Sequence, residues 1–184
     1  MAKHLLRAAL VLPLLSSAAL AAGVANLWLN VPFVEQQKDG CGAAVISMVM
    51  QYWQQQRGLP TDEKAAYVHI ERRLYSPKAH GIYASAMKRY FKENGYRVFA
   101  FAGQRADLAR EIAKGRPLIA ALKPEGGGEL HYVVVVGVDE PDRLILVNDP
   151  AQRKLLKEDR AAFERDWKAT GNWTLLAVPE THPQ

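Results

Sequence analysis

The sequence contains a single cysteine, Cys41, among its 184 residues, so no disulfide can form within the chain. It also lacks the metal-binding patterns HExxH and CxxC and the phosphate-binding pattern GxxxxGK(S/T). There is no internal repeat and no low-complexity tract. These absences exclude a disulfide scaffold, a zinc peptidase of the HExxH kind and an ATP-driven enzyme, and we expect neither a metal nor a cofactor.

Charge of one sign is not in large excess either. The formal net charge is +5, hydrophobic residues make up 49% and charged residues 23%, which is ordinary for a globular protein. Basic residues alternate with acidic ones, so there is no basic stripe of the kind that binds nucleic acid. The length is that of one domain with a buried core. We therefore expect a single domain that binds neither nucleic acid nor ATP.

The longest apolar run lies at the N-terminus. It follows two positive residues and ends with small residues at Ala19 and Ala21, which is the pattern of a signal peptide. We expect cleavage after Ala21, with a signal peptide at 1–21 and a periplasmic or secreted domain at 22–184. The alternative is an uncleaved membrane anchor, but the strongly apolar part is shorter than the ~20 residues that a membrane span needs.

Apolar periodicity predicts helices first and strands second along the mature chain. Helices are expected at 41–56, 62–73 (capped by Thr61), 82–93, 106–114 and 159–168. Strands are expected at 97–102, 117–122, 131–138, 143–148 and 173–178. This segregation favours an α+β fold with a mostly antiparallel sheet. A helical lobe facing a sheet lobe would leave a cleft in which a site can form.

Cys41 begins the most strongly periodic of these helices, between Gly40 and Gly42. The first N–H groups of a helix have no partners within it, and the helix dipole adds positive charge there, so a thiolate is stabilised and the thiol pKa is lowered. The flanking glycines would let a substrate backbone approach the sulfur. A lone cysteine in an exported protein suggests a reactive thiol. We interpret Cys41 as a nucleophile rather than as a buried small hydrophobic residue.

Two glutamines, Gln36 and Gln37, come shortly before Cys41. A side-chain amide N–H at that place can join the backbone N–H of Cys41 in binding a developing oxyanion. We prefer Gln36 as this donor, and Gln37 remains the alternative.

His131 opens the valine-rich strand, and Asp149 follows the strand expected to return beside it. If the two strands form a hairpin that turns near 140–141, His131 lies opposite residue 150, within one or two register steps of Asp149. A carboxylate there would hold the imidazole in one tautomer and stabilise its charged form. Asn148 is the alternative partner if the register is off by one.

In chain order these residues supply an amide donor, a thiol, an imidazole and a carboxylate, which is the set needed for acyl transfer through a thiol. The same three side chains that follow the glutamine could ligate zinc in principle, but their spacing matches no zinc motif. We therefore interpret the set as catalytic.

Three segments, VPFVEQQKDGCGAAVISMVMQYW, HYVVVVGVD and ILVNDPA, resemble the bacteriocin-processing (double-glycine) peptidase family of the papain superfamily. The likeness covers residues 28–179, and FERDWKATGNWTLLAVP is similar to stand-alone, exported members. The resemblance implies a papain-like fold and thiol-dependent hydrolysis of peptide bonds. The roles it implies are oxyanion-hole donor for Gln36, nucleophile for Cys41, base for His131 and third member for Asp149.

Two features depart from the family pattern. Ala43 stands where many relatives have proline, and the spacing from glutamine to cysteine is shorter than in the transporter-linked branch, which leaves Gln36 and Gln37 both open. The chain carries no transporter spans and no phosphate loop, so leader processing during ATP-driven export is not implied.

The sequence thus predicts an exported, monomeric cysteine peptidase that acts on a peptide or protein substrate, with an envelope or secretion-system partner also compatible with export. Two alternatives use the same cleft. The acyl group could pass from the thioester to an amine, as in a transpeptidase, or the chain could be an inactive peptide-binding module.

Overall fold

The computed structural model describes residues 27–125 and 127–180, and the signal peptide expected at 1–21 lies outside them. The helices are α1 (Cys41–Gln56), α2 (Glu63–Leu74), the short 3-10 helix η1 (Pro77–Ala79), α3 (Ala84–Glu93), α4 (Arg105–Ala113) and α5 (Arg160–Lys168). The strands are β1 (Leu27–Trp28), β2 (Tyr96–Ala102), β3 (Leu118–Leu122), β4 (His131–Asp139), β5 (Leu144–Asp149), β6 (Arg153–Asp159) and β7 (Trp173–Pro179). No helix in the described ranges is long and apolar enough to span a bilayer.

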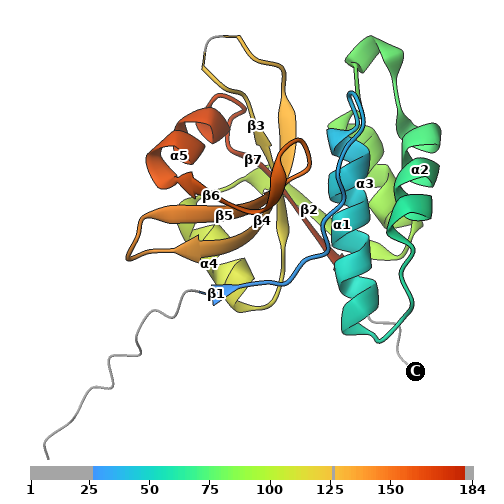
Figure 1. Cartoon of the computed structure of the whole chain (residues 1–184), viewed down its shortest axis with the longest axis horizontal. Coiled ribbons are helices and arrows are strands. Elements are labelled where there is room, and N and C mark those ends of the chain that lie inside the picture. The colour runs from blue at the N-terminus through green and yellow to red at the C-terminus, as the bar shows by residue number, and fades with distance from the viewer. Residues whose placement is uncertain (1–26, 126, 181–184) are drawn as a thin grey trace, which may run out of the picture.

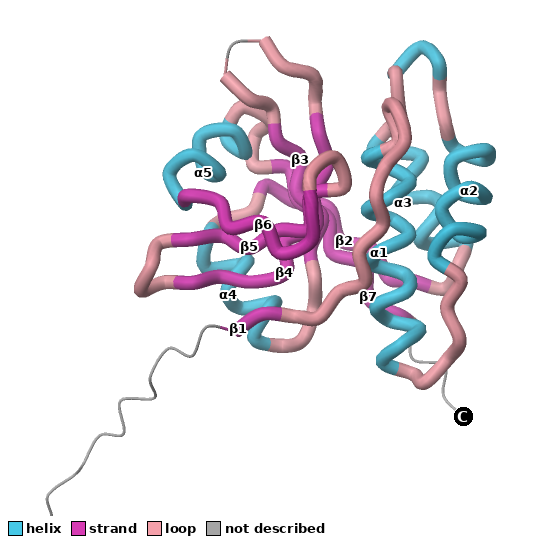
Figure 2. Tube along the Cα trace, in the orientation of Figure 1, coloured by secondary structure: helices cyan, strands magenta, loops and turns pink. Residues whose placement is uncertain are grey.

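The strands form one seven-stranded sheet in the order β2-β7-β3-β4-β5-β6, with β1 added along β4. Every described strand pair is antiparallel. Helices α1, α2 and α3 stand together on one side of the molecule, and the sheet with α4 and α5 makes up the other (Figures 1 and 2). This arrangement confirms the expected α+β fold with a helical lobe and a sheet lobe.

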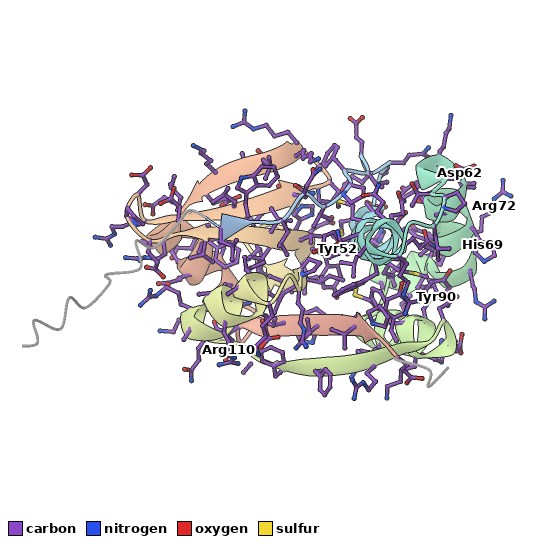
Figure 3. All side chains as sticks on the ribbon, turned by 90° about the horizontal axis from the view of Figure 1, so that it is seen from below. Tyr52, Asp62, His69, Arg72, Tyr90 and Arg110 are labelled. Atoms are coloured by element: carbon purple, nitrogen blue, oxygen red, sulfur yellow. The ribbon has the colours of Figure 1, made fainter. Side chains whose placement is uncertain are left out.

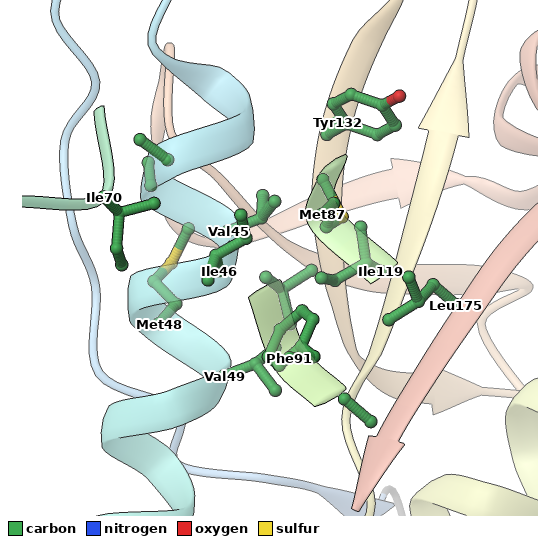
Figure 4. Close-up of a cluster of buried hydrophobic side chains, with 14 of the residues drawn as sticks. Val45, Ile46, Met48, Val49, Ile70, Met87, Phe91, Ile119, Tyr132 and Leu175 are labelled. Carbon is green, nitrogen blue, oxygen red and sulfur yellow. The ribbon is translucent and has the colours of Figure 1, made fainter. Parts of the chain in front are cut away.

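Helix α1 joins the two lobes because it is covered on nearly all sides. Ten of its 16 residues are buried, which is what a helix between a helical layer and a sheet requires. Figure 4 shows Val45 and Val49 of α1 directed towards Ile119 of β3 and Leu175 of β7. The small side chain of Ala43 is also fully buried. Packing against the sheet therefore fixes where the first turn of α1, with Cys41, lies.

Strand β4 is buried on both faces, which explains its run of valines. Val134 and Val136 belong to the core shared with α1, and Val133 and Val135 belong to a second core that is covered by α4 and α5. The strand that begins with His131 is thus held rigidly at the centre of the molecule.

The predicted helices and strands begin and end within about two residues of the sequence-based bounds. The two-residue strand β1 and the short η1 were not expected, and there are two further corrections. Asp62 rather than Thr61 caps α2, since its carboxylate accepts the Ala65 N–H at 2.9 Å. Strand β6 was not expected, because it lies at an edge of the sheet and only Leu155 and Leu156 of its seven residues are apolar. Charged edge strands of this kind give little periodic signal.

The β4–β5 register differs from the expected one by one residue at Val134 and Val135, and by two from Gly137 onwards. Val134 pairs with Asn148 rather than with Val147, and the ladder is irregular before Gly137. A side chain at Gly137 would place its Cβ 2.9 Å from the Cβ of Trp28, so glycine lets β1 pair closely with β4 there. The hairpin prediction was correct in topology and wrong by one to two register steps.

Candidate active site

The thiol of Cys41 lies at the N-terminal end of α1 and is partly buried. No side chain caps this helix, and its first turn contains no acidic residue. The first hydrogen bond of the helix runs from the Ala44 N–H to the Gly40 carbonyl at 3.0 Å. The preceding N–H groups, including that of Cys41, have no partner within the helix and are available to a negatively charged group.

The two glycines beside Cys41 make room for the chain itself. A side chain at Gly40 would overlap the Tyr67 hydroxyl, and one at Gly42 would come within 2.8 Å of the Cβ of Ile82. The expectation that these glycines open a path for substrate is therefore corrected. They allow α2 and the segment before α3 to pack closely around the first turn of α1.

His131 contacts both residues with which the sequence grouped it. Its Nε2 atom lies 2.7 Å from Oδ1 of Asp149, which leaves Nδ1 to face the neighbouring Cys41. Burial alone would lower the pKa of His131, but the hydrogen bonds to Asp149 and Cys41 and the negative charge on both partners raise it to about 9. The imidazole is therefore favoured as a cation at neutral pH.

Asp149 is held by more than the histidine. Its Oδ1 accepts the Ala151 N–H at 2.9 Å, and its Oδ2 accepts an N–H of the Gln152 side chain at 2.7 Å. Burial would raise the pKa of Asp149, but the hydrogen bond and charge of His131, with these two donors, hold it below its usual range. Sequence reasoning missed Gln152, although an Asp-Pro turn commonly folds back on the aspartate.

Asn148, the alternative partner of His131, instead makes structural hydrogen bonds to the backbone. Its side chain is fully buried and donates to the Val31 carbonyl at 3.1 Å, while its Oδ1 accepts the Leu155 N–H at 3.0 Å. These two hydrogen bonds link the segment before Gln36 to strand β6. The one-residue uncertainty of the hairpin is resolved in favour of Asp149 as the residue beside His131.

The two glutamines differ in their surroundings. The Gln36 backbone N–H donates to the Pro150 carbonyl at 2.9 Å, directly after Asp149, and its Oε1 is buried without a described hydrogen-bond partner. Gln37 is exposed, and its backbone N–H donates to the Tyr67 hydroxyl at 3.0 Å. Gln36 is thus the glutamine that is fixed to the His131–Asp149 side of the site.

Residues 28–175 match the model of the Peptidase_C39 like family. The chain belongs to this family. Membership confirms the resemblance drawn from the sequence and supports a peptidase function. No curated protein sequence matches the chain.

Solved structures of C39-like peptidases share the fold of this family member. A protein from Bacillus anthracis described as a C39-like peptidase matches with a TM-score of 0.60 and 18% identity, over 85% of this chain and 99% of that one. The peptidase domain of Streptococcus ComA, a bifunctional ABC transporter involved in quorum sensing, matches with a TM-score of 0.62 and 20% identity, over 80% of this chain and 98% of that one. The peptidase domain of Streptococcus mutans ComA matches with a TM-score of 0.56 and 19% identity, over 80% of this chain and 98% of that one. These likenesses show the papain-like fold.

In this C39-like chain the thiol opens onto a groove of about 520 Å³. Cys41, Ile82, Tyr83, Leu130 and Tyr132 supply most of its apolar lining, and the rest comes from the segment Lys78–Gly81, from Ala84 and from Glu129. The loop between β3 and β4 contributes Glu129 and Leu130 to this lining.

Tyr132, which follows His131 in β4, also lines this groove. Sequence reasoning did not single out this residue. It lies where the α1–sheet core meets the site, with its hydroxyl directed away from the core (Figure 4). Burial and the nearby charge of Cys41 raise its pKa to about 12, so its hydroxyl stays neutral. Only its place in the chain, directly after His131 on an alternating strand, could have drawn attention to it.

Proposed function

We propose that this member of the Peptidase_C39 like family is an exported cysteine peptidase that hydrolyses a peptide or protein substrate. The observation that carries the proposal is the 2.7 Å hydrogen bond between His131 and Asp149 beside Cys41, which begins α1. A thiol, an imidazole and a buried carboxylate in this order are the parts of a thiol-dependent acyl-transfer site.

The resting site is an ion pair of Cys41 thiolate and His131 imidazolium. Asp149 accepts a hydrogen bond from the Nε2–H group of His131, which orients the ring and offsets its positive charge. The N-terminus of α1 favours the negative charge on the sulfur. A pKa of about 9 for His131 keeps the imidazolium half of this pair charged at neutral pH.

The thiolate attacks the scissile carbonyl carbon, a C–S bond forms, and the carbonyl oxygen becomes an oxyanion. The backbone N–H of Cys41 is one donor for that oxygen, and the Gln36 side-chain amide is the second. The tether from Gln36 to Pro150 supports this choice over the exposed Gln37.

The tetrahedral intermediate then collapses. His131 gives its Nδ1 proton to the amine, the C–N bond breaks, and a thioester remains on Cys41. A water molecule, losing a proton to the now neutral His131, attacks the thioester and releases the acid product. The proton left on His131 and the freed thiolate restore the resting ion pair.

The groove beside Cys41 suits a segment of peptide, because its lining combines apolar side chains with the polar Lys78, His80 and Glu129. Export is proposed from the N-terminal sequence pattern at 1–21, and hydrolysis in the periplasm or outside the cell follows from it.

The test is the pH dependence of Cys41 alkylation together with peptide cleavage. In the wild type we expect rapid alkylation well below the free-thiol pKa of ~8.5, and in His131→Ala a profile near that value. Cys41→Ala should abolish both labelling and cleavage. Cleavage that persists in Cys41→Ala would reject the mechanism.

Two further outcomes separate the alternative functions. Product masses that include an added amine acceptor would indicate transpeptidation, and ordinary thiol reactivity without cleavage would indicate a binding module.

A further inference from the structure

The two edges of the sheet are built differently. The β6 edge has Lys154, Lys157 and a positive φ of 52° at Leu155, which are common protections against pairing with another chain. The β2 edge has none of these. Its seven residues pair with β7 in an unbroken register, it contains no proline or lysine, and no described strand lies along its outer side.

The outward backbone groups of β2 follow from its ladder. The Glu180 N–H donates to the Gly95 carbonyl, and the Gly103 N–H donates to the Asn172 carbonyl, so odd-numbered residues of this strand bond to β7. Even-numbered residues therefore direct their N–H and C=O groups away from β7. Those of Val98 and Ala100 lie at the middle of the outer edge.

Helix α3 supplies one wall beside this edge. Ser85, Lys88, Arg89 and Lys92, spaced by three and four residues, form a single stripe that lines a groove of about 540 Å³ with Val98 and Ala100. Arg89 forms an ion pair with Glu93. Lys88 and Lys92 are in no ion pair within the described ranges. The groove is thus basic on its α3 side.

The opposite face of β2 carries Phe99 and Phe101 and, near the start of the strand, the exposed Arg97. Phe99 is 51% exposed, and Phe101 lies beside it. Arg110 and Arg116, which border these rings, both pair with Glu111. Figure 3 shows β2 as the outermost strand, running between the region of Arg110 on α4 and that of Tyr90 on α3.

A strand added to β2 would have one row of side chains beside the lysines and the other beside the phenylalanines. Acidic residues at every second position recur about every 6.6 Å along a strand, and Lys88 and Lys92 are separated by about 6 Å along the helix axis. We propose that the groove between α3 and β2 binds an extended segment of another protein, with alternating acidic and apolar residues, as an added strand.

A second copy of this chain is a poorer occupant. An antiparallel pair of two β2 strands has its two-fold axis perpendicular to the sheet, so the two α3 helices would share one face. Lys88 and Lys92 of each copy would then face like charges, which repel. Acidic side chains from a different protein remove that repulsion.

The site is distinct from the proposed peptidase centre and can be tested without cleavage. The experiment uses the full chain with Cys41→Ala and a fluorescent probe peptide of alternating valine and glutamate, measured by anisotropy at low and high salt. Peptides with lysine in place of glutamate, and with the glutamates in one block, are the peptide controls. Heparin tests for general attraction to polyanions, and the mass of the protein in solution tests for self-association.

Three variants locate the binding. Lys88→Glu with Lys92→Glu should weaken binding at least about tenfold, while Lys154→Glu with Lys157→Glu on the opposite edge, an equal change of charge, should leave it unchanged. Ala100→Pro removes one outward N–H without breaking the β7 ladder and should also weaken binding. Thermal melting checks folding, and Lys88→Gln with Lys92→Gln replaces the reversal if that variant is unfolded.

The decisive readout is hydrogen exchange. On peptide binding, the amides of Val98 and Ala100 should become protected, while those of Arg97 and Phe99, already bonded to β7, should change little. The proposal is overturned by no binding up to about 1 mM probe at low salt, by equal binding to the Lys88/Lys92 variant, by equal binding of the block peptide or heparin, or by edge protection that arises from dimerisation.

Discussion

The Nε2 atom of His131 lies 2.7 Å from Oδ1 of Asp149, although the β4–β5 ladder ends at Val134 and Asn148 before it reaches either side chain. The contact is therefore not a cross-strand pair. It forms where the two strands have separated, and the turn after β5 fixes the carboxylate through Ala151 and Gln152. Because Ala151 and Gln152 fix the Asp149 carboxylate, the carboxylate in turn orients the imidazole of His131.

The raised pKa of His131 predicts a stability that depends on pH. The protonated form is favoured in the folded state, so its contribution is fully present below pH 6.5, the ordinary pKa, and is lost as the pH rises to about 9. We expect the unfolding free energy of the wild type, relative to His131→Gln, to fall by the order of 1–3 kcal/mol over that interval. Urea unfolding under reducing conditions measures it, and a constant difference would contradict the ion pair.

Substitutions at the adjacent residues Asn148 and Asp149 should affect different properties, namely stability and the pH profile of catalysis. Asp149→Asn removes the negative charge, so the pKa of His131 should fall and the alkaline limb of the kcat/KM profile should move to lower pH, with a loss of about 10- to 100-fold in kcat/KM. Asn148→Ala leaves the Val31 carbonyl and the Leu155 N–H unpaired, and should cost about 1–3 kcal/mol of stability. Its alkaline limb should stay where it is. The same shift in both variants would show that the change is only structural.

The two glutamines provide a matched pair for the oxyanion hole. Gln36→Ala should lower kcat by about 10²- to 10³-fold, because one donor to the oxyanion is lost, while alkylation of Cys41 should be unaffected. Gln37→Ala keeps its backbone bond to Tyr67 and should change kcat by less than about threefold. Steady-state kinetics of peptide cleavage decide between them, and a larger loss in Gln37→Ala would reassign the donor.

Tyr67 and Gly40 should be energetically coupled. Gly40→Ala places a methyl group against the Tyr67 hydroxyl and should destabilise the fold by about 1–3 kcal/mol. Tyr67→Phe alone loses its bonds to Gln37 and Glu71, at a cost of about 1 kcal/mol. The double variant should be more stable than the sum of the two changes implies, because the hydroxyl that clashes is absent. Additive free energies in the double-mutant cycle would contradict the packing described.

Much of the fold was predictable because its signals are local. The periodicity of α1, the valines of β4 and the turn at Asp139 each arise within a few residues. Strand β6 was missed because most of its residues are charged and it lies at an edge of the sheet, so its sequence shows no alternation of apolar and polar residues. The cap of α2 was misplaced by one residue, since Thr61 and Asp62 are both good caps and only the backbone angles select between them.

The candidate site was predictable to a similar extent. A lone cysteine at a helix start, a histidine at the opening of a strand and an acid after the returning strand can be recognised in the sequence alone. The sequence by itself determined these residue types and their order. Spacing could not choose between the two glutamines or place the acid to within one residue, because a one-residue change in register alters every contact.

Tertiary structure decided the rest. It ties Gln36 to Pro150, assigns Asn148 to the Val31 segment, fills the space at Gly40 and Gly42 with the chain's own side chains, and leaves β2 without a partner strand in the described ranges. The physical reason is the same in each case. Hydrogen-bond partners and packing neighbours far apart in the sequence are selected by how the helices and strands pack together, which no local pattern encodes.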